Sequence, residues 1–312
     1  MNSIGYPSNG LFDFQINGFR GVDFQSETLA LAELRYAIDQ LEREGLTGIF
    51  LTLITASEDR LCRQFERIEA MRASDPVIAD LVKGYHLEGP WLSPKSGYRG
   101  AHPPGSMRAP TLDAYDRLQN AAGGNIRLIT LAPEWPGSPE FIASVCRHGL
   151  HVSLGHTDAS EAEIDDAIRA GARYCTHLGN GVPLTLARHD NVIQRLLARD
   201  ELTACFIPDG IHLLPFVLKN FFRAKPAGKV LFTTDAMAAA GAPEGQYTIG
   251  ALSVRVGADR VAREPGGQFA GSTLTPSAGV ALTARYLDLD YASAWNLWSE
   301  APAKAFGIEL RS

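Results

Sequence analysis

The stretch TGIFLTLIT, residues 47–55, indicates the fold of this chain. It contains Ile49, Phe50 and Leu51 in succession, without the polar alternation of a strand that has one face in water. Successive strand residues point to opposite faces, so such a strand must be covered on both sides. Strands covered on both sides are typical of a parallel sheet flanked by helices.

Seven further apolar runs predict strands, at residues 11–16, 81–89, 126–134, 151–157, 172–180, 202–210 and 229–236. Helical patterns alternate with them, at 29–45, 58–72, 111–120, 138–148, 160–170, 190–199 and 213–223. In the first helix, Leu31, Leu34, Ile38 and Leu41 recur at helical spacing. Eight βα units predict a (β/α)8 TIM-like barrel.

The chain after the eighth strand departs from this pattern. Residues 246–262 predict a β-hairpin insertion, and two closing helices follow it. We therefore expect residues 1–312 to form a single catalytic barrel domain.

Composition limits the classes of partner and compartment. The 312 residues are 45% hydrophobic and carry a net charge of -6, which favours neither nucleic acid nor an anionic membrane as a partner. The four cysteines include no CxxC pair, so no disulfide framework or thiolate metal site is indicated. No signal peptide or membrane-spanning run is recognisable, and we expect a cytoplasmic protein.

Polar residues occupy the ends of several predicted strands, where the active site of such a barrel lies. They are Gln15, Asn17, Glu88, His156, His177, Asp209, His212 and Asp235. One carboxylate and two imidazoles make a three-ligand set for zinc or a similar divalent metal. A bound metal lowers the pKa of its water, and Asp235 can move the proton. These residues predict metal-assisted hydrolysis of an amide or similar bond.

Seven motifs occur in the order and spacing of a known family. They are HLEGPWLSP (86–94), RGAH (99–102), SLGHT (153–157), THLGNGVP (176–183), PDGIH (208–212), TTDAM (233–237) and GSTLT (271–275). In these motifs the chain resembles the N-acetylglucosamine-6-phosphate deacetylases of the amidohydrolase superfamily. The resemblance implies hydrolysis of the acetamide of N-acetylglucosamine 6-phosphate, or of a close N-acyl amino sugar, to the free amine and acetate.

The resemblance also implies roles for individual residues. Glu88, His156 and His177 match the metal ligands, Asp235 matches the catalytic acid and base, and His102 matches a histidine that polarises the acetamide carbonyl. The implied substrate-binding residues are Asn180 and Gly181 (phosphate, through backbone amides), Arg188 (phosphate), His212 (sugar) and Leu274 (acetyl group). Arg188 falls where the family has an arginine that reaches across a homodimer interface.

Gln15 and Asn17 stand where many amidohydrolases have the HxH motif that supports a second metal. Neither amide is a good substitute for imidazole as a zinc ligand. We expect one divalent metal ion per subunit, with zinc as the default and iron as the alternative.

The chain departs from the family in three places. It begins almost at the first barrel strand, so we expect the family's accessory β-sandwich to be lacking. The segment LARHDN (186–191) replaces the usual surroundings of Arg188, and Asn-Gly-Val (180–182) replaces Asn-Ala-Met. Arg188 is then either a phosphate ligand or an exposed charge at the start of a helix, and Asp190 either assists binding or caps that helix.

Two other functions remain open from the residues alone. One is hydrolysis of a different, unphosphorylated or cyclic amide, and the other is a non-catalytic barrel that binds a sugar phosphate. Three neighbouring residues also have open roles. His86 is expected to support the ligands or to pack, Trp91 to wall or to cover the pocket, and Asp209 to orient His212 or to shape its turn.

Overall fold

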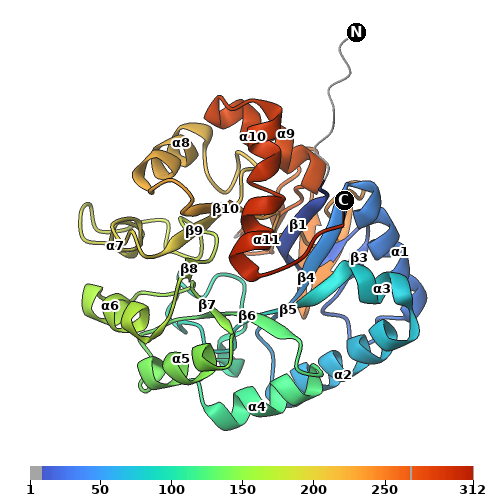
Figure 1. Cartoon of the computed structure of the whole chain (residues 1–312), viewed down its shortest axis with the longest axis horizontal. Coiled ribbons are helices and arrows are strands. Elements are labelled where there is room, and N and C mark those ends of the chain that lie inside the picture. The colour runs from blue at the N-terminus through green and yellow to red at the C-terminus, as the bar shows by residue number, and fades with distance from the viewer. Residues whose placement is uncertain (1–8, 268, 312) are drawn as a thin grey trace.

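The fold is a nearly closed barrel of eight parallel strands surrounded by helices (Figure 1). The computed structural model describes residues 9–267 and 269–311. In barrel order, the strands are β1 (Leu11–Ile16), β4 (Leu46–Ile54), β5 (Val82–Glu88), β6 (Ile126–Leu131), β7 (His151–Leu154), β8 (Tyr174–Cys175), β9 (Thr203–Phe206) and β10 (Val230–Phe232). The predicted (β/α)8 fold and its eight strands are confirmed.

The helices form the outer ring of the barrel (Figure 1). They are α1 (Leu31–Arg43), α2 (Glu58–Ser74), α3 (Pro76–Leu81), α4 (Leu112–Ala121), α5 (Ser138–Arg147), α6 (Glu161–Ala170), α7 (Val192–Leu197) and α8 (Pro215–Ala224). Helix α1 buries Leu34, Ile38 and Leu41 as predicted, whereas Leu31 is its first residue and is 41% exposed. The short helix α3 was not predicted.

Most strands end earlier than the apolar runs suggest. The runs 151–157 and 172–180 contain only four and two strand residues, in β7 and β8. The residues beyond each strand leave the ladder and turn into the loops at the mouth of the barrel. His156 and His177, which continue these apolar runs in the sequence, therefore lie in the loops at the mouth and not in the strands.

Asp13 helps to close the barrel between its first and last strands. Its carboxylate accepts hydrogen bonds from the Thr233 hydroxyl (2.5 Å), the Thr234 hydroxyl (2.6 Å) and the Thr234 amide (2.9 Å). The backbone adds a bond of 2.7 Å from the Asn17 amide to the Ala236 carbonyl. Side-chain bonds therefore take the place of a regular ladder between β1 and β10.

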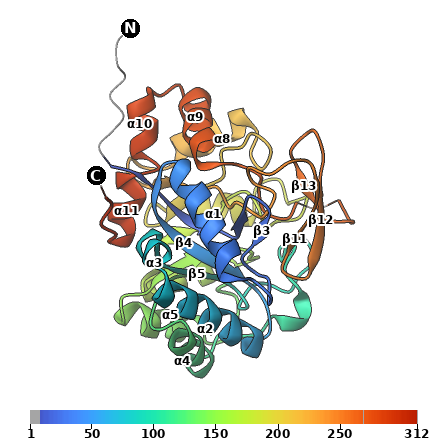
Figure 2. The same ribbon diagram turned by 90° about the vertical axis from the view of Figure 1, so that its right-hand side faces the viewer.

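Helix α11 (Glu300–Phe306) covers the end of the barrel opposite the mouth (Figure 2), and Phe306 is its last residue. Its ring stacks on Tyr174 at a centroid distance of 4.9 Å and meets Phe14 and Phe50 at 5.1 and 5.4 Å. The preceding helices α9 (Pro276–Leu287) and α10 (Tyr291–Asn296) complete the outer ring. This aromatic cluster closes the end of the barrel opposite the predicted site.

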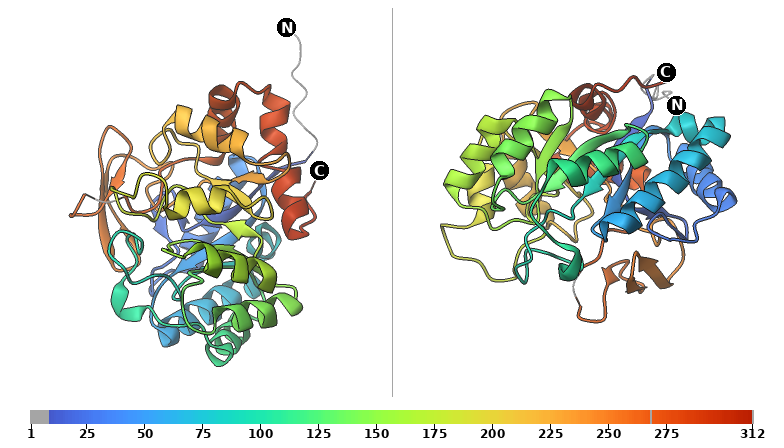
Figure 3. Two further views of the ribbon diagram at one scale, coloured as in Figure 1. Left: turned by 90° about the vertical axis from the view of Figure 1, so that its left-hand side faces the viewer. Right: turned by 90° about the horizontal axis from the view of Figure 1, so that it is seen from below.

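A three-stranded antiparallel sheet projects at the mouth, at the end opposite α11 (Figures 2 and 3). It consists of β11 (Gly245–Ile249), β12 (Leu252–Val256) and β13 (Ala262–Arg263). The small pair β2 (Gly18–Phe19) and β3 (Val22–Asp23) holds it: Asp23 accepts hydrogen bonds from the Thr248 hydroxyl and the Gly250 amide, at 2.9 and 3.0 Å.

Among the described residues, no helix combines the length and the apolar character needed to cross a bilayer.

Candidate metal centre and active site

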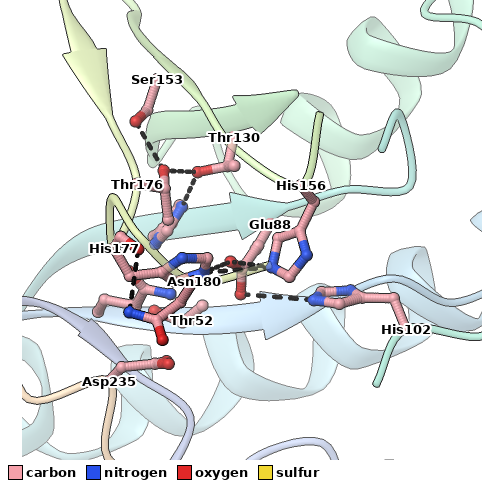
Figure 4. A network of polar contacts seen from close by, with 12 residues as sticks. Thr52, Glu88, His102, Thr130, Ser153, His156, Thr176, His177, Asn180 and Asp235 are labelled. Carbon is pink, nitrogen blue, oxygen red and sulfur yellow. Dashed lines mark hydrogen bonds and ion pairs between the residues drawn. The ribbon is translucent and has the colours of Figure 1, made fainter. Parts of the chain in front are cut away.

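Glu88, His156 and His177 converge at the mouth of the barrel (Figure 4). Glu88 is the last residue of β5, and the two histidines follow β7 and β8. His177 Nε2 lies 3.0 Å from Glu88 Oε1 and 3.1 Å from His156 Nε2, and His156 Nε2 lies 3.4 Å from Glu88 Oε1. All three side chains are buried.

This triad fits a divalent metal ion. Ligand atoms at about 2.0–2.2 Å from a tetrahedral zinc ion are separated by roughly 3.3–3.5 Å, close to the separations found here. His156 Nδ1 lies 2.9 Å from the Tyr98 carbonyl oxygen, which can only accept a hydrogen bond. His156 Nδ1 therefore carries the proton, and its Nε2 lone pair faces the centre of the triad.

The electrostatics of the triad are consistent with this fit. Although burial acts to raise it, the close contacts with the imidazoles of His156 and His177 hold the pKa of Glu88 well below its usual range. The site thus keeps a charged carboxylate between two imidazoles, which are the donors that zinc and similar ions prefer.

Three residues of the site adopt the left-handed backbone region that side chains other than glycine rarely occupy. The φ angles of His156, His177 and Asp235 are 52°, 30° and 49°. Each such residue costs on the order of 1–3 kcal/mol and persists only where its surroundings impose it. The turn after each strand directs the side chain back toward the barrel axis.

Two glycines make room for the His156 ring. A Cβ atom at Gly181 would lie 2.7 Å from His156 Nδ1, and a Cβ atom at Gly100 would lie 3.0 Å from His156 Cε1. Both glycines have positive φ angles, of 63° and 54°. Larger residues at these positions would displace the imidazole, so the loops around the metal centre require glycine for space as well as for conformation.

Asp235 follows β10, lies at the edge of the triad and is 8% exposed (Figure 4). Burial, together with the nearby charge of Glu88, raises its pKa to about 8. Asn17 Nδ2 donates a hydrogen bond of 2.7 Å to Asp235 Oδ1. Gln15 is fully buried, and neither atom of its amide has a hydrogen-bond partner among the described residues.

His102 approaches the triad from the long loop after β5 (Figure 4). Its Nε2 lies 3.9 Å from Glu88 Oε2, and its ring packs against that of His156 at a centroid distance of 4.5 Å. Its Nδ1 lies 2.9 Å from Thr55 Oγ1. Burial, reinforced by His156, lowers the pKa of His102 to about 3, so the ring is neutral.

A buried polar chain underlies the ligands (Figure 4). The Thr176 hydroxyl lies 2.6 Å from those of Thr130 and Ser153, and Thr130 Oγ1 lies 2.8 Å from His86 Nε2. His86 therefore supports the floor of the site from within the barrel. Because Thr176 precedes His177, this chain holds the strand end that carries a ligand.

The implied substrate-binding residues are distributed around the mouth. The Asn180 amide already donates to the His177 carbonyl at 3.0 Å, whereas no hydrogen bond from the Gly181 amide is found among the described residues. His212 Nδ1 lies 2.6 Å from Asp209 Oδ2. Leu274 is buried, and Arg188 is exposed on the loop before α7 without a charged partner among the described residues.

The structure decides the open roles of three residues. Trp91 neither walls nor caps the pocket, because it is fully buried and packs edge-on against Phe141 at 5.0 Å. Asp190 does not cap α7: Asn191 does so by accepting from the Gln194 amide, and Asp190 pairs with Arg195. Asp209 both orients the His212 ring and shapes its turn, since it also accepts from the His212 amide.

Sequence reasoning missed Thr55, Tyr98 and Asp13, which all support the site. Thr55 lies 47 positions from His102, and Tyr98 lies 58 positions from His156. Threonine at a strand end and a backbone carbonyl in a loop carry no chemical signature of their own. Only the alternation in FDFQIN (12–17), which places Asp13 on the same face as Gln15, offered a signal.

Comparisons with known proteins agree with this geometry. The chain is 33% identical over 301 residues to an N-acetylglucosamine-6-phosphate deacetylase of Bacillus subtilis, covering 96% of this chain and 75% of the relative. It is 30% identical over 304 residues to the enzyme of that name from Vibrio furnissii, covering 96% and 73%.

A solved structure supports the same relationship. The structure of an alanine mutant of N-acetyl-D-glucosamine-6-phosphate deacetylase from Mycobacterium smegmatis, in complex with N-acetyl-D-glucosamine-6-phosphate, is similar with a TM-score of 0.86 and 31% identity. The match covers 97% of this chain and 78% of that one. No protein-family model matches the chain.

Proposed function

Because the chain belongs to the N-acetylglucosamine-6-phosphate deacetylase family, we propose that it hydrolyses the acetamide of N-acetylglucosamine 6-phosphate to the free amine and acetate. The observation that carries this proposal is the convergence of Glu88, His156 and His177 with Asp235 and His102 in one buried cluster. The cluster combines a metal centre, a proton carrier and a hydrogen-bond donor, which together suffice to hydrolyse an amide.

We assign the triad to one zinc ion, which Glu88, His156 and His177 would hold. When bound, a divalent ion supplies Lewis acidity and lowers the pKa of the attacking water. A second ion is not expected, because Asn17 is committed to Asp235 and the Gln15 amide is a poor zinc ligand. Elemental analysis should find about one equivalent of zinc, and His156→Ala should abolish it.

Asp235 is assigned to both proton transfers. It takes a proton from water as the water oxygen bonds to the acetamide carbon, and it then delivers that proton to the nitrogen as the C–N bond breaks. Asn17 holds one carboxylate oxygen and leaves the other available to the proton. His102 donates a hydrogen bond to the carbonyl oxygen as negative charge develops on it.

The phosphate is assigned to the Gly181 amide and to Arg188. In the described part of the chain the Gly181 amide makes no hydrogen bond, and Arg188 lies exposed on the same loop. Because Arg188 matches a family arginine that reaches across a homodimer interface, we propose that it serves the site of a second copy. A gel-filtration mass of about twice that of one chain would agree with this arrangement.

The deciding experiment measures acetate release from N-acetylglucosamine 6-phosphate and from N-acetylglucosamine by the zinc-loaded protein. We expect strong preference for the phosphorylated sugar. Arg188→Ala should raise KM for the phosphorylated sugar alone, whereas Arg147→Ala, at an exposed arginine on α5, should change neither KM. Equal turnover of both sugars would favour an unphosphorylated amide as the substrate, a function that the altered surroundings of Arg188 also suggest.

A further inference from the structure

Thr55, the residue after β4, is the only side chain among the described residues that hydrogen-bonds to the His102 ring. Its Oγ1 lies 2.9 Å from His102 Nδ1, and the side chain is 3% exposed. A Cβ atom at Gly89 would lie 2.1 Å from Thr55 Oγ1, so the backbone beside Glu88 encloses the hydroxyl. The threonine is therefore held where it can act on the imidazole.

The direction of this hydrogen bond depends on which atom carries the proton. The hydroxyl has a single hydrogen, which can go to the Glu88 carbonyl oxygen at 3.4 Å or, where His102 Nδ1 carries no proton, to that nitrogen at 2.9 Å. The shorter contact is the stronger hydrogen bond whichever atom donates, so its direction follows from the state of the other ring nitrogen.

The other ring nitrogen decides the direction. A neutral imidazole has one N–H group, so the state of Nε2 fixes that of Nδ1. His102 Nε2 faces the carboxylate of Glu88 at 3.9 Å. An Nε2–H group there is attracted to the carboxylate, whereas an Nε2 lone pair would be repelled.

We propose that Thr55 is a positioning residue, whose hydroxyl donates a hydrogen bond to His102 Nδ1 and so holds His102 as the Nε2–H tautomer that polarises the substrate carbonyl. The Nδ1–H tautomer would instead present a lone pair to the carbonyl oxygen and could not stabilise negative charge there. The kinetic consequences rest on the proposed deacetylase function, whereas the tautomer itself does not.

The test compares Thr55→Val, which keeps the shape and removes the hydroxyl, with Thr55→Ser, which keeps the hydroxyl. Thr55→Val should lower kcat for N-acetylglucosamine 6-phosphate by about 10- to 100-fold with KM changed by less than about 3-fold, since one donor to the developing charge is lost. Thr55→Ser should recover kcat to within about 3-fold. Zinc content should stay unchanged in both.

A second substrate separates positioning from a general structural defect. The N-trifluoroacetyl analogue has a more electrophilic carbonyl and needs less polarisation, so Thr55→Val should lower its kcat by only about 3-fold or less. Thr283→Val is the matched control, because it removes a buried hydroxyl that accepts from the Trp298 indole, far from the site. The control should lower stability and leave kcat for both substrates unchanged.

Nuclear magnetic resonance of the zinc-loaded protein with ¹⁵N-labelled histidine tests the tautomer without activity. The His102 signals, identified by their loss in His102→Asn, should show a protonated Nε2 in the wild type and a shift toward Nδ1–H in Thr55→Val. A wild-type Nδ1–H tautomer, or equal losses of kcat for both substrates without recovery in Thr55→Ser, would overturn the proposal. If the wild type released no acetate, the proposed function would fail while the tautomer result still stood or fell by itself.

Discussion

Replacement of Gly181 by alanine should weaken metal binding through a single steric contact. The added Cβ atom would lie 2.7 Å from His156 Nδ1 and 3.0 Å from Cε1. An ordinary contact needs roughly 3.4 Å, so the imidazole or the loop must move by about 0.7 Å. Zinc ligands are held to within about 0.2 Å, and the same movement strains the hydrogen bond from His156 Nδ1 to Tyr98.

The magnitude can be divided into two parts with a matched control. Alanine at a φ of 63° costs on the order of 1–2 kcal/mol of stability, whatever its surroundings. Gly149→Ala imposes the same backbone cost, because Gly149 has a φ of 81° and no atom lies within 4 Å of its added Cβ. Loss of support for a metal ligand typically lowers affinity about 10- to 100-fold, and only Gly181→Ala should show it.

The assay is competition for zinc between the protein and a chromophoric chelator, with urea unfolding of the metal-free proteins alongside. Both variants should unfold at lower urea than the wild type, and Gly181→Ala alone should release zinc more readily. Unchanged zinc affinity in Gly181→Ala would refute the idea that this glycine is needed to seat His156. Equal loss of affinity in both variants would assign the effect to backbone strain in general.

Three further results are expected. Asp235→Asn should lower kcat about 10²- to 10⁴-fold while zinc content and KM persist, and an active variant would contradict its role in proton transfer. Phe306→Ala should lower the free energy of unfolding by about 3–5 kcal/mol in urea titrations, because the Phe306 ring fills the end of the barrel away from the metal centre. KM should not change. A loss of stability below about 1 kcal/mol would contradict this role. Burial raises the pKa of Asp23 from 3.8 to about 6, so the folded state binds this proton more tightly than the unfolded state. As the pH rises from about 4 to above 6, the free energy of unfolding of the wild type should fall by up to roughly 3 kcal/mol relative to that of Asp23→Asn. An equal shift of the urea midpoint in both proteins between these pH values would contradict this expectation.

The barrel was predictable because its strands and helices can be recognised from patterns of neighbouring residues. The burial of Ile49, Phe50 and Leu51 on both faces of β4 and the helical spacing in α1 are properties of neighbouring residues in the chain. The convergence of Glu88, His156 and His177 also followed, since parallel strands of a barrel end at one mouth. Neither inference needed a contact between distant segments.

Other features depended on the closure of the barrel. The predicted strands extended past the ends of β7 and β8, because the apolar pattern did not reveal the left-handed turns at His156 and His177. The burial of Trp91 against Phe141 is likewise a contact between separate βα units. Such contacts depend on how the units pack around the barrel axis, which no local pattern encodes.

The amino-acid sequence by itself determined the order of the barrel elements and the kinds of chemical group at their ends. Both follow from hydrophobic periodicity, which is a property of residues close together in the chain. Tertiary structure alone decided which group faces which: Thr55 toward His102, Asn17 toward Asp235 and Gly181 against His156. Hydrogen-bond direction and steric fit change over a few tenths of an ångström. Separations of that size between distant segments exist only once the barrel has closed.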